Sequence, residues 1–254
     1  VIGSQMVKAR EAQALVTAGS TGAFMAAGLM IIGRLPIVER PALAPIIPTR
    51  DGRGAIILDV GANMDAKPEH LLQYSIMGAI YAEKILGRQN PRVALLNVGA
   101  EEGKGNVVTK EAYSLLAKAG INFVGNLEAR EVMDGGVDVI VCDGFTGNVL
   151  IKFMEGMAAT IFDMLKEQFV ADLPSKIGAY LLKPSLRRLK SSLDYSDYGG
   201  APLLGIDGIC VKCHGSSNRK AIMNGLFQAQ GFIENRVVDV VATSLAKIKE
   251  QNTM

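Results

Sequence analysis

The sequence predicts an α/β protein in three layers, with a mostly parallel sheet lying between two layers of helices. Two observations lead to this fold class. Helix and strand patterns alternate from the start of the chain to about residue 156, which is typical of a parallel sheet with helices on both faces. In addition, four apolar runs of strand type each end in a turn rich in Gly, Asn or Asp, and a helical pattern begins directly after it.

These four strand-to-turn junctions are the strongest local signal in the chain. The strands are expected at residues 14–18, 55–59, 92–97 and 137–143, and their turns at 19–22, 60–63, 98–106 and 144–148. In an open parallel sheet such turns lie at the carboxyl ends of the strands, where these folds bind ligands. Each turn offers backbone N–H groups at a helix start, which suits an anion such as phosphate.

The remaining elements follow from the same reading. Helices are expected at residues 20–34, 68–86, 107–119 and 148–168. Four prolines between residues 35 and 48 remove backbone donors, so this segment is expected to be an edge strand or a crossing loop. Residues 172–190 are predicted to form two short helices around Pro184. A last strand at 205–213 and a closing helix from about residue 217 complete the chain.

Length and composition are those of a globular protein with a large core. The chain has 254 residues, of which 49% are hydrophobic and 20% charged. We expect a single α/β/α domain over residues 1–254, with a helical hairpin insertion at 172–192. The chain opens without Met in what reads as a helix already under way, so an earlier part of the domain is expected to be missing. A net charge of +2 gives no strong field, and no nucleic-acid partner is expected.

The three cysteines are interpreted as structural, and their number favours a reducing, cytoplasmic setting over a disulfide framework. Cys210, Cys213 and His214 match the spacing of c-type haem attachment, but nothing in the chain indicates export. A redox or zinc site is also disfavoured, because the pair lies on an apolar strand and lacks finger spacing. We therefore expect no cofactor and no metal. The longest apolar stretch, residues 23–32, is about half of the ~20 residues that a membrane span needs.

Two of the turns contain groups suited to an anion. Gly99, Gly103 and Gly105 permit close backbone approach, and Lys104 between them supplies a point charge for phosphate. A surface turn with an exposed lysine is an equally open interpretation. In the turn at residues 143–148, Thr146 or Asn148 is expected to cap the long helix. The same groups could donate hydrogen bonds to an oxyanion.

A third turn carries a dense polar cluster. Its members are Asp59, Asn63, Asp65, Lys67, Glu69 and His70. Paired carboxylates could bind Mg²⁺. We favour helix capping by Asp65, with Pro68 in the first turn, over a metal site.

The segment at residues 172–190 is basic and amphipathic. The leucines that fall near one face are Leu181, Leu182, Leu186 and Leu189, and the cations include Lys183, Arg187, Arg188 and Lys190. A helical hairpin packed on its own domain is one interpretation. The other is a tip that contacts a membrane or an acidic partner.

Eight short phrases occur together in the order and spacing of one family. They are AGSTGA (18–23), DVGAN (59–63), AKPEH (66–70), NVG (97–99) with GKGN (103–106), GNLEAR (125–130), DGFTGN (143–148), YGG (198–200) and HGS (214–216). With these phrases the chain resembles the bacterial acyl-ACP:phosphate acyltransferases (PlsX family) over nearly its whole length. Three departures are visible. The family's amino-terminal strand with its Asp/Gly-rich loop is absent, Ser20 stands where Asn is usual, and Cys213 stands where Ala is common.

The resemblance implies reversible transfer of a long-chain acyl group from acyl carrier protein to inorganic phosphate, with acyl phosphate as the product for phospholipid synthesis. It also implies a fold like that of isopropylmalate dehydrogenase and phosphotransacetylase, a homodimer, and a cytoplasmic enzyme associated peripherally with the inner face of the membrane. The product would be used by a glycerol-3-phosphate acyltransferase. Because phosphate is itself the nucleophile, no Ser-His-Asp or Cys-His arrangement is needed.

The candidate site residues combine these turns with the resemblance. Lys104, Asn148 and His214 are the expected catalytic residues, although His214 could equally be a structural capping residue. Phosphate and substrate binding is expected at Gly19, Ser20, Thr21, Gly22, Asn63, Lys67, Gly99, Gly103, Gly105, Asp143, Gly144, Thr146, Gly147 and Ser216. Membrane or carrier-protein contact is expected at Leu181, Leu182, Lys183, Leu186, Arg187, Arg188 and Lys190.

Two alternative functions remain open at this point. One is a dehydrogenase-like enzyme of the same architecture that binds a dinucleotide, although the chain lacks G-x-G-x-x-G. The other is a catalytically silent scaffold that recruits lipid-synthesis enzymes to membranes.

Overall fold

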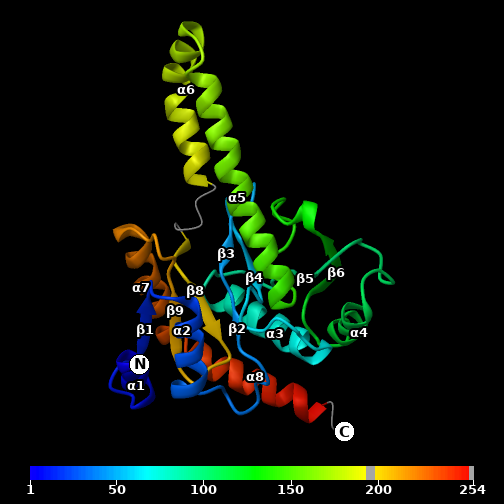
Figure 1. The fold of residues 1–254 in the computed structure, drawn as a ribbon. Helices are drawn as coiled ribbons and strands as arrows, with labels where there is room; N and C mark the ends of the chain where they lie inside the picture. The colour runs from blue at the N-terminus through cyan, green and yellow to red at the C-terminus, as the bar shows by residue number, and fades with distance from the viewer. Residues whose placement is uncertain (193–197, 252–254) are drawn as a thin grey trace.

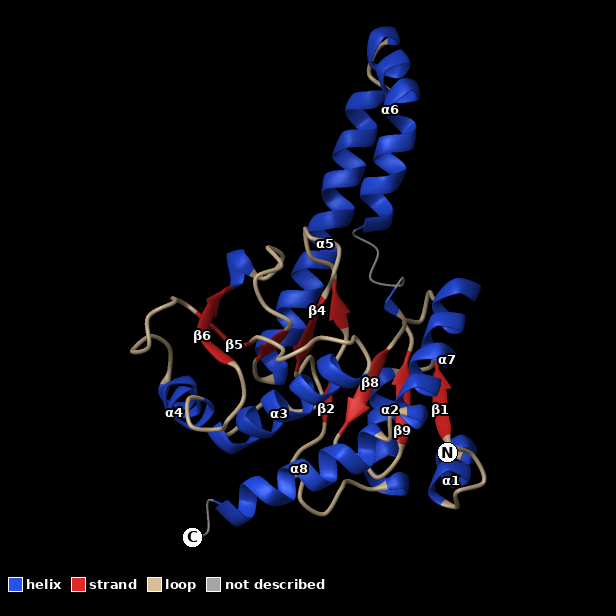
Figure 2. Ribbon diagram, turned by 180° about the vertical axis from the view of Figure 1, so that it is seen from behind, coloured by secondary structure: helices blue, strands red, loops and turns tan. Residues whose placement is uncertain are grey.

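A computed structural model describes residues 1–192 and 198–251, and it shows an α/β fold built on two sheets (Figures 1 and 2). The four-stranded sheet has the order β1-β9-β8-β2 and the five-stranded sheet the order β3-β4-β7-β5-β6. The strands are β1 (Ala14–Thr17), β2 (Ala42–Leu43), β3 (Ile46–Ile47), β4 (Ala55–Leu58), β5 (Val93–Asn97), β6 (Phe123–Glu128), β7 (Val139–Val141), β8 (Ala201–Leu204) and β9 (Ile209–Lys212).

The α/β class with parallel strands is confirmed, and these strands are divided between the two sheets. Four pairs are parallel, namely β1–β9, β4–β7, β7–β5 and β5–β6. The pairs β2–β8, β8–β9 and β3–β4 are antiparallel. The proline-rich segment forms β2 and β3, which are two-residue edge strands of different sheets, so the edge-strand alternative is the correct one of the two predicted.

Helices cover both faces of the strands. They are α1 (Ile2–Lys8), α2 (Thr21–Ala27) continuing into the π-helical turn Gly28–Ile32, α3 (Pro68–Lys84), α4 (Val107–Leu116), a 3-10 turn (Ala129–Glu131), α5 (Gly144–Phe169), α6 (Leu173–Ser192), α7 (Arg219–Glu234) and α8 (Val237–Gln251). In β4, Ile56 and Leu58 pack in one apolar cluster with α3, α4, α7 and α8, whereas Ile57 packs in a second cluster with α1, α2 and α5. Alternate strand residues therefore face opposite helical layers, as expected for a three-layer protein.

Several predicted boundaries need correction. Helix α5 begins at Gly144, because the Asp143 side chain caps it by accepting the Thr146 N–H at 2.8 Å. Thr146 and Asn148 are therefore not its caps. The strand expected at 205–213 begins at Ile209, since residues 205–208 form the turn that connects it to β8, and the closing helix is two helices, α7 and α8.

The second half of α5 and all of α6 project from the body as a two-helix hairpin (Figure 1). The prediction of two short helices within 172–190 is wrong, because α6 runs unbroken through Pro184. The lost hydrogen bond is that of the Tyr180 carbonyl, and this residue is exposed, so water can replace the missing N–H. Over the residues that the structure describes, we find no helix with the length and apolar character of a membrane span.

Candidate functional site

A cavity of about 590 Å³ lies among α5, the β2–β3 segment and the residues that end β9. Its volume falls in the range of small-molecule sites. The lining residues come from many segments: Thr21, Leu43, Pro45, Ile46, Ile47, Pro48, Val60, Met133, Asn148, Ile151, Met154, Glu155, Met157, Ala158, Ile161, Tyr198, Gly199, Gly200, Ala201, Lys212, Cys213, His214 and Ser217. Most of this lining is apolar, with a small set of polar groups.

One face of α5 forms an apolar wall. Ile151, Met154, Ala158 and Ile161 follow each other at helical spacing and line the cavity, opposite the β2–β3 segment. Ile161 lies 13 residues after Asn148, which is about 20 Å at the rise of an α-helix. The cavity is therefore long enough along α5 for an extended chain rather than a compact ligand.

The polar part of the lining comes from the ends of two neighbouring strands, β1 and β9, in addition to Asn148 on α5. Strands β1 and β9 are parallel, with Thr17 opposite Lys212, and the Cys213 N–H donates to the Thr17 carbonyl at 2.7 Å. The loops after both strands consequently leave the sheet at one edge. Thr21, the first residue of α2, follows the first loop, and His214 and Ser217 lie in the second. Three residues predicted for the site, Thr21, Asn148 and His214, therefore line one cavity.

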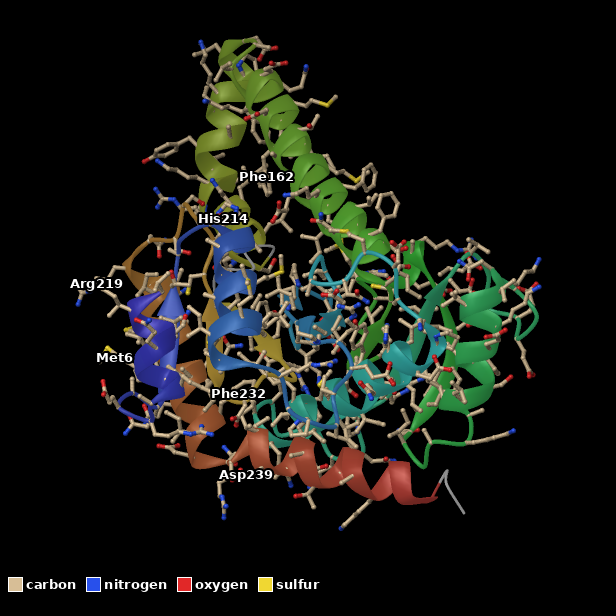
Figure 3. All side chains as sticks on the ribbon, turned by 60° about the horizontal axis from the view of Figure 1, so that its bottom comes forward. Met6, Phe162, His214, Arg219, Phe232 and Asp239 are labelled. Atoms are coloured by element: carbon tan, nitrogen blue, oxygen red, sulfur yellow. The ribbon has the colours of Figure 1, made fainter. Side chains whose placement is uncertain are left out.

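His214, labelled in Figure 3, has its ring held by hydrogen bonds within its own loop. Its Nδ1 accepts the Ser216 N–H at 3.2 Å and lies 2.7 Å from the Ser216 hydroxyl oxygen. Because a backbone N–H points at Nδ1, the neutral ring carries its proton on Nε2. Ser216, predicted to bind substrate, therefore orients His214. The result is a ring that can donate a hydrogen bond from Nε2.

The start of α5 is pressed against the turn after β4. A Cβ on Gly144 would lie 2.7 Å from the Asn63 carbonyl oxygen, and one on Gly147 would lie 2.0 Å from that of Asp59. These two glycines therefore allow a close backbone approach that any side chain would prevent. Gly61 has a φ of +126°, and a Cβ there would lie 3.7 Å from Asn148 Cγ. The turn after β4 thus lies against Asn148.

Asp59 is a structural anchor of that turn. Its buried carboxylate accepts the N–H groups of Leu43 at 2.9 Å, Ala62 at 3.1 Å and Asn63 at 2.6 Å. Burial raises the pKa of Asp59, while these backbone hydrogen bonds oppose the shift. The bond to Leu43 ties β2, and with it one cavity wall, to the turn after β4.

The helix start at Pro68 differs from the prediction. Lys67 occupies the N-cap position, and its N–H donates to His70 Nδ1 at 3.0 Å, so Asp65 is not the cap. The polar cluster around His70 is made of direct side-chain contacts. The Nε2 atom of the buried His70 lies 3.2 Å from Glu39 Oε2, and burial lowers the pKa of the His70 ring. The Asn63 amide nitrogen lies 3.4 Å from both His70 Nδ1 and the Tyr74 hydroxyl oxygen. In the described ranges, no group of three or more His, Cys, Asp or Glu residues is placed to hold a metal ion.

The glycine-rich turn after β5 does not line this cavity. Lys104 is half-exposed, with Nζ 4.0 Å from Glu101 Oε1, and its carbonyl accepts the Asn97 side-chain N–H at 3.2 Å. Gly105 has a φ of +96°. Because β5 and β7 are parallel neighbours, this turn leaves the same sheet edge as α5. The structure thus leaves Lys104 apart from the cavity lining, and its role, with those of Gly99, Gly103 and Gly105, stays a prediction.

Lys212 is a cavity residue that sequence reasoning missed. It ends β9, its side chain is buried, and its Nζ donates to the Cys213 carbonyl oxygen. The sequence offered a signal, because a lysine follows the apolar residues Ile209, Cys210 and Val211 and lies two residues before His214. We interpreted residues 210–213 only as the strand that positions the histidine.

The environment of the three cysteines disfavours a nucleophilic role. All are buried, and burial raises the pKa of each thiol, to about 12 for Cys210. The thiolate, which is the reactive form, is therefore suppressed.

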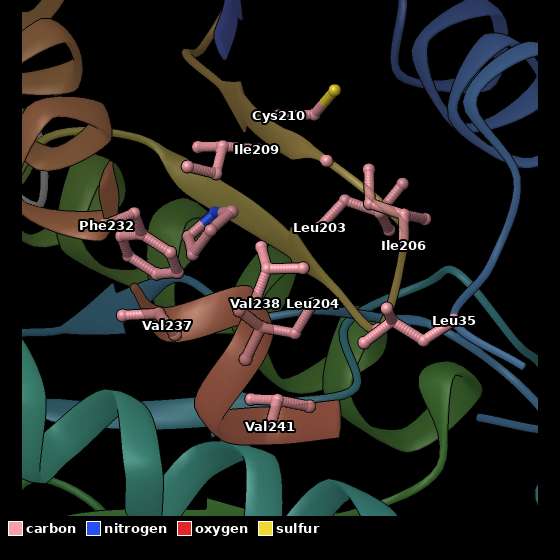
Figure 4. Close-up of a pocket in the computed structure, with 13 residues that line it drawn as sticks. Leu35, Leu203, Leu204, Ile206, Ile209, Cys210, Phe232, Val237, Val238 and Val241 are labelled. Carbon is pink, nitrogen blue, oxygen red and sulfur yellow. The ribbon is translucent and has the colours of Figure 1, made fainter. Parts of the chain in front are cut away.

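A second cavity, of about 20 Å³, lies between β8–β9 and helices α7 and α8 (Figure 4). Leu204, Ile209, Phe232 and Val241 are among its lining residues, and no charged side chain lines it. It has room for about one water molecule and offers almost no polar partners, so we interpret it as a packing defect.

Known proteins resemble this chain closely in sequence. A family model described as "Fatty acid synthesis protein" matches residues 1–240. The chain is 55% identical over 246 residues to a phosphate acyltransferase of Exiguobacterium sp. (strain ATCC BAA-1283 / AT1b), which covers 97% of this chain and 75% of the relative. It is 53% identical over 247 residues to a phosphate acyltransferase of Brevibacillus brevis, with 97% and 74% covered.

Solved structures share the fold. A phosphotransacetylase from Streptococcus pyogenes superposes with a TM-score of 0.57 at 16% identity, covering 96% of this chain and 67% of that one. A branched-chain phosphotransacylase from Enterococcus faecalis V583 gives 0.55 at 16% identity, covering 91% and 78%. At such identity the likeness shows the fold alone, and the predicted phosphotransacetylase-like fold is confirmed. With a family model matched over nearly the whole chain and relatives above half identity, the resemblance found in the motifs is confirmed as well: the chain belongs to the fatty acid synthesis protein family.

Proposed function

We propose that this protein transfers a long-chain acyl group from acyl carrier protein to inorganic phosphate and releases an acyl phosphate. The observation that carries this proposal is a single cavity that joins a long apolar wall to a cluster of hydrogen-bond donors. An acyl thioester needs both parts, because its chain is apolar and its reacting carbon develops an oxyanion. The relatives at 51–56% identity bear the name phosphate acyltransferase, which supports the same reaction.

The length of the apolar wall fits a long acyl chain. An extended chain advances by roughly 1.2 Å per bond, as the reach of a polypeptide implies. The interval of about 20 Å between Asn148 and Ile161 then spans roughly 16 carbons. The wall residues are aliphatic, sulfur-containing or small, which matches an acyl chain better than a nucleotide.

The reaction follows from positioning and charge. A phosphate oxygen attacks the thioester carbonyl carbon, a C–O bond forms, and the carbonyl electron pair moves onto its oxygen. When this oxyanion collapses, the C–S bond breaks, and the sulfur leaves with the electron pair and takes up a proton to become the carrier thiol. The Asn148 amide and the His214 Nε2–H are donors suited to the oxyanion. In this mechanism phosphate attacks the thioester directly, and no acyl-enzyme forms. The burial of all three cysteines agrees with it, because no exposed thiol is available to take up the acyl group.

The proposal is tested by following the product. Purified protein is incubated with palmitoyl-acyl carrier protein and phosphate, and acyl phosphate is trapped with hydroxylamine and quantified by mass spectrometry. We expect product that depends on phosphate and on no nicotinamide cofactor. A silent scaffold would give no product, and a dehydrogenase would respond only to an added dinucleotide.

We also propose that two copies associate through α5. Four large apolar side chains, Phe145, Val149, Phe153 and Met164, are each more than half exposed, and their spacing places them along one side of the helix. Exposed apolar patches of this kind mark association surfaces. Light scattering should give twice the chain mass for the wild type and the single chain mass for Phe153→Glu. A monomeric wild type would exclude the homodimer.

The hairpin is proposed to contact the membrane, which makes the protein a cytoplasmic, peripherally bound enzyme of the inner membrane face. Leu181 is 72% and Leu182 is 51% exposed on α6. Lys183, Arg187, Arg188 and Lys190 are also exposed, and Leu186 is half-buried. Apolar and cationic side chains on one helix suit an anionic lipid surface. Such a location would place the acyl phosphate beside a membrane glycerol-3-phosphate acyltransferase.

A further inference from the structure

We infer that Lys212 is the cation that binds the attacking inorganic phosphate at the polar end of the cavity. This inference rests on the proposed function and names a residue for one of its substrates. The sequence analysis did not single out Lys212, and its assignment depends on where β9 ends.

Burial makes an isolated ammonium group costly. Lys212 is only 8% exposed, and the one hydrogen bond that its Nζ makes with described residues goes to the Cys213 carbonyl. An ammonium group has three N–H donors, so two remain for a ligand. No Asp or Glu within the described ranges forms an ion pair with it. A buried cation without a counter-charge favours an anion as its partner.

The cavity restricts where that anion can sit. Lys212 lines it together with Thr21, Asn148, His214 and Ser217, which are donors or can act as donors. The carboxylate of the lining, Glu155, follows Asn148 by seven residues, or about 10 Å along α5, toward the apolar wall. The adjacent ends of β1 and β9, where Lys212 lies, also supply Thr21, His214 and Ser217, so several donors and one positive charge enter the cavity from one edge of the four-stranded sheet. Phosphate, with several acceptor oxygens and no apolar surface, fits this set.

Lys212 differs from the other lysine considered for phosphate. Lys104 is half-exposed and lies 4.0 Å from the Glu101 carboxylate, so water and a counter-charge already satisfy it. Lys212 has neither. A charge in a partly dry site attracts an anion more strongly than the same charge at the surface.

The titration of Lys212 agrees with this role. Burial lowers the pKa of its ammonium group below the usual value for lysine, with Cys213 opposing the shift. The other titratable groups that line the cavity are Glu155, Tyr198, Cys213 and His214. A bound phosphate dianion would stabilise the ammonium form. When the pH rises above the pKa of Lys212, the ammonium group loses its charge and phosphate binding should weaken. Because that pKa is lowered, the loss of binding should begin at a lower pH than it would with an ordinary lysine.

In the reaction step, Lys212 holds phosphate and moves no proton. Its N–H groups bind phosphate oxygens that do not attack, which leaves another oxygen to form the C–O bond. The positive charge offsets the negative charge that phosphate brings beside the developing oxyanion.

The test separates the two substrates. Lys212→Met removes the charge at similar length, and Lys152→Met, on an exposed position of α5, is the matched control. Loss of a hydrogen-bonded charge should raise KM for phosphate about 10- to 100-fold. We expect KM for palmitoyl-acyl carrier protein to change less than threefold, and neither KM to move in the control. Calorimetric titration with inorganic phosphate should show the same loss of affinity.

An unchanged phosphate KM in folded Lys212→Met would overturn the inference while leaving the proposed function intact. A wild type that forms no acyl phosphate would instead overturn the function. If Lys212→Met does not fold, the inference is tested by reductive methylation of wild-type lysines with and without phosphate. We then expect phosphate to protect Lys212 but not Lys152, and equal modification of Lys212 with and without phosphate would contradict its assignment.

Discussion

At the scale of single residues, the site depends on donors that the fold fixes before substrate arrives. Asn148 is held in the second turn of α5, against the turn after β4, and His214 is oriented by Ser216. Donors that are already in place when charge develops stabilise that charge efficiently, which is why we propose these two residues for the oxyanion.

Asn148→Ala should lower kcat by ~10²–10³, the usual effect of losing one oxyanion donor. Asn148→Asp, which keeps the shape but replaces the amide donor with a negative charge, should lose at least as much. Steady-state rates on acyl carrier protein substrate provide the measurement. Near-wild-type rates in correctly folded variants would remove Asn148 from the mechanism.

Lys104→Ala tests the residue predicted from the glycine-rich turn. If Lys104 neutralises phosphate or the oxyanion, its loss should lower kcat by ~10²–10³, whereas Lys110→Ala on the exposed side of α4 should leave it unchanged. Equal rates for both variants would show that Lys104 has no catalytic role. Its exposure and its ion pair with Glu101 would then be those of an ordinary surface lysine.

His214→Gln distinguishes catalysis from loop stability. We expect a lower kcat with an unchanged melting temperature, because the amide cannot reproduce the oriented Nε2–H while the loop keeps its backbone contacts. A lower melting temperature with full activity is the opposite result, and it would make His214 a structural residue.

At the scale of elements, the sequence predicts those features that local chemistry determines. The apolar runs predicted as strands at residues 14–18, 55–59, 92–97 and 137–143 correspond to β1, β4, β5 and β7, with ends that differ by up to two residues. The turns after them precede α2, α3, α4 and α5. The prolines before β4 predicted an edge strand or a crossing loop for the same local reason, and two short edge strands are observed.

Features that depend on tertiary contacts could not be predicted in the same way. Helix α6 continues through Pro184 because the preceding turn is exposed to water. The cap of α5 depends on which of Asp143, Thr146 and Asn148 the backbone places at the helix start. Lys212 enters the site only because β1 and β9 pair in parallel, and no local pattern specifies that pairing.

The cavity wall on α5 gives a prediction with a matched control. Ala158 lines the cavity and lies about 15 Å beyond Asn148, whereas its neighbour Ala159 is exposed. Ala158→Phe should block the groove after roughly 12 carbons, so that activity falls on palmitoyl but not on octanoyl carrier protein. Ala159→Phe should leave both unchanged. Equal loss on both chain lengths with Ala158→Phe would show that the acyl chain lies elsewhere.

The hairpin gives the next prediction. Leu181→Glu with Leu182→Glu should release the protein from anionic liposomes in a flotation assay and leave activity on soluble substrate largely intact. Ser185→Glu with Ser192→Glu adds the same charges to α6 without removing an apolar side chain, and should weaken binding far less. Charge reversal at Arg187 and Arg188 should weaken binding most at low salt, where screening is least. If the leucine variant still floats with liposomes, the hairpin is not a membrane contact.

At the scale of the whole molecule, each of the two sheets positions a different part of the cavity lining. The four-stranded sheet delivers Thr21, Lys212 and His214 from the ends of β1 and β9, and the five-stranded sheet positions α5 with Asn148 and the apolar wall. The cavity therefore exists only in the assembled fold. The consequence that we propose for the mechanism is that phosphate, rather than a side chain of the protein, attacks the acyl group.

A single-turnover experiment tests that consequence most directly. Protein in excess is mixed with palmitoyl-acyl carrier protein, with and without inorganic phosphate, and free carrier thiol, acyl phosphate and acylated protein are measured over time. We predict that without phosphate no thiol is released and no protein is acylated, and that with phosphate one acyl phosphate appears for each thiol. Thiol release in the absence of phosphate, with the acyl group found on the protein, would contradict direct attack by phosphate.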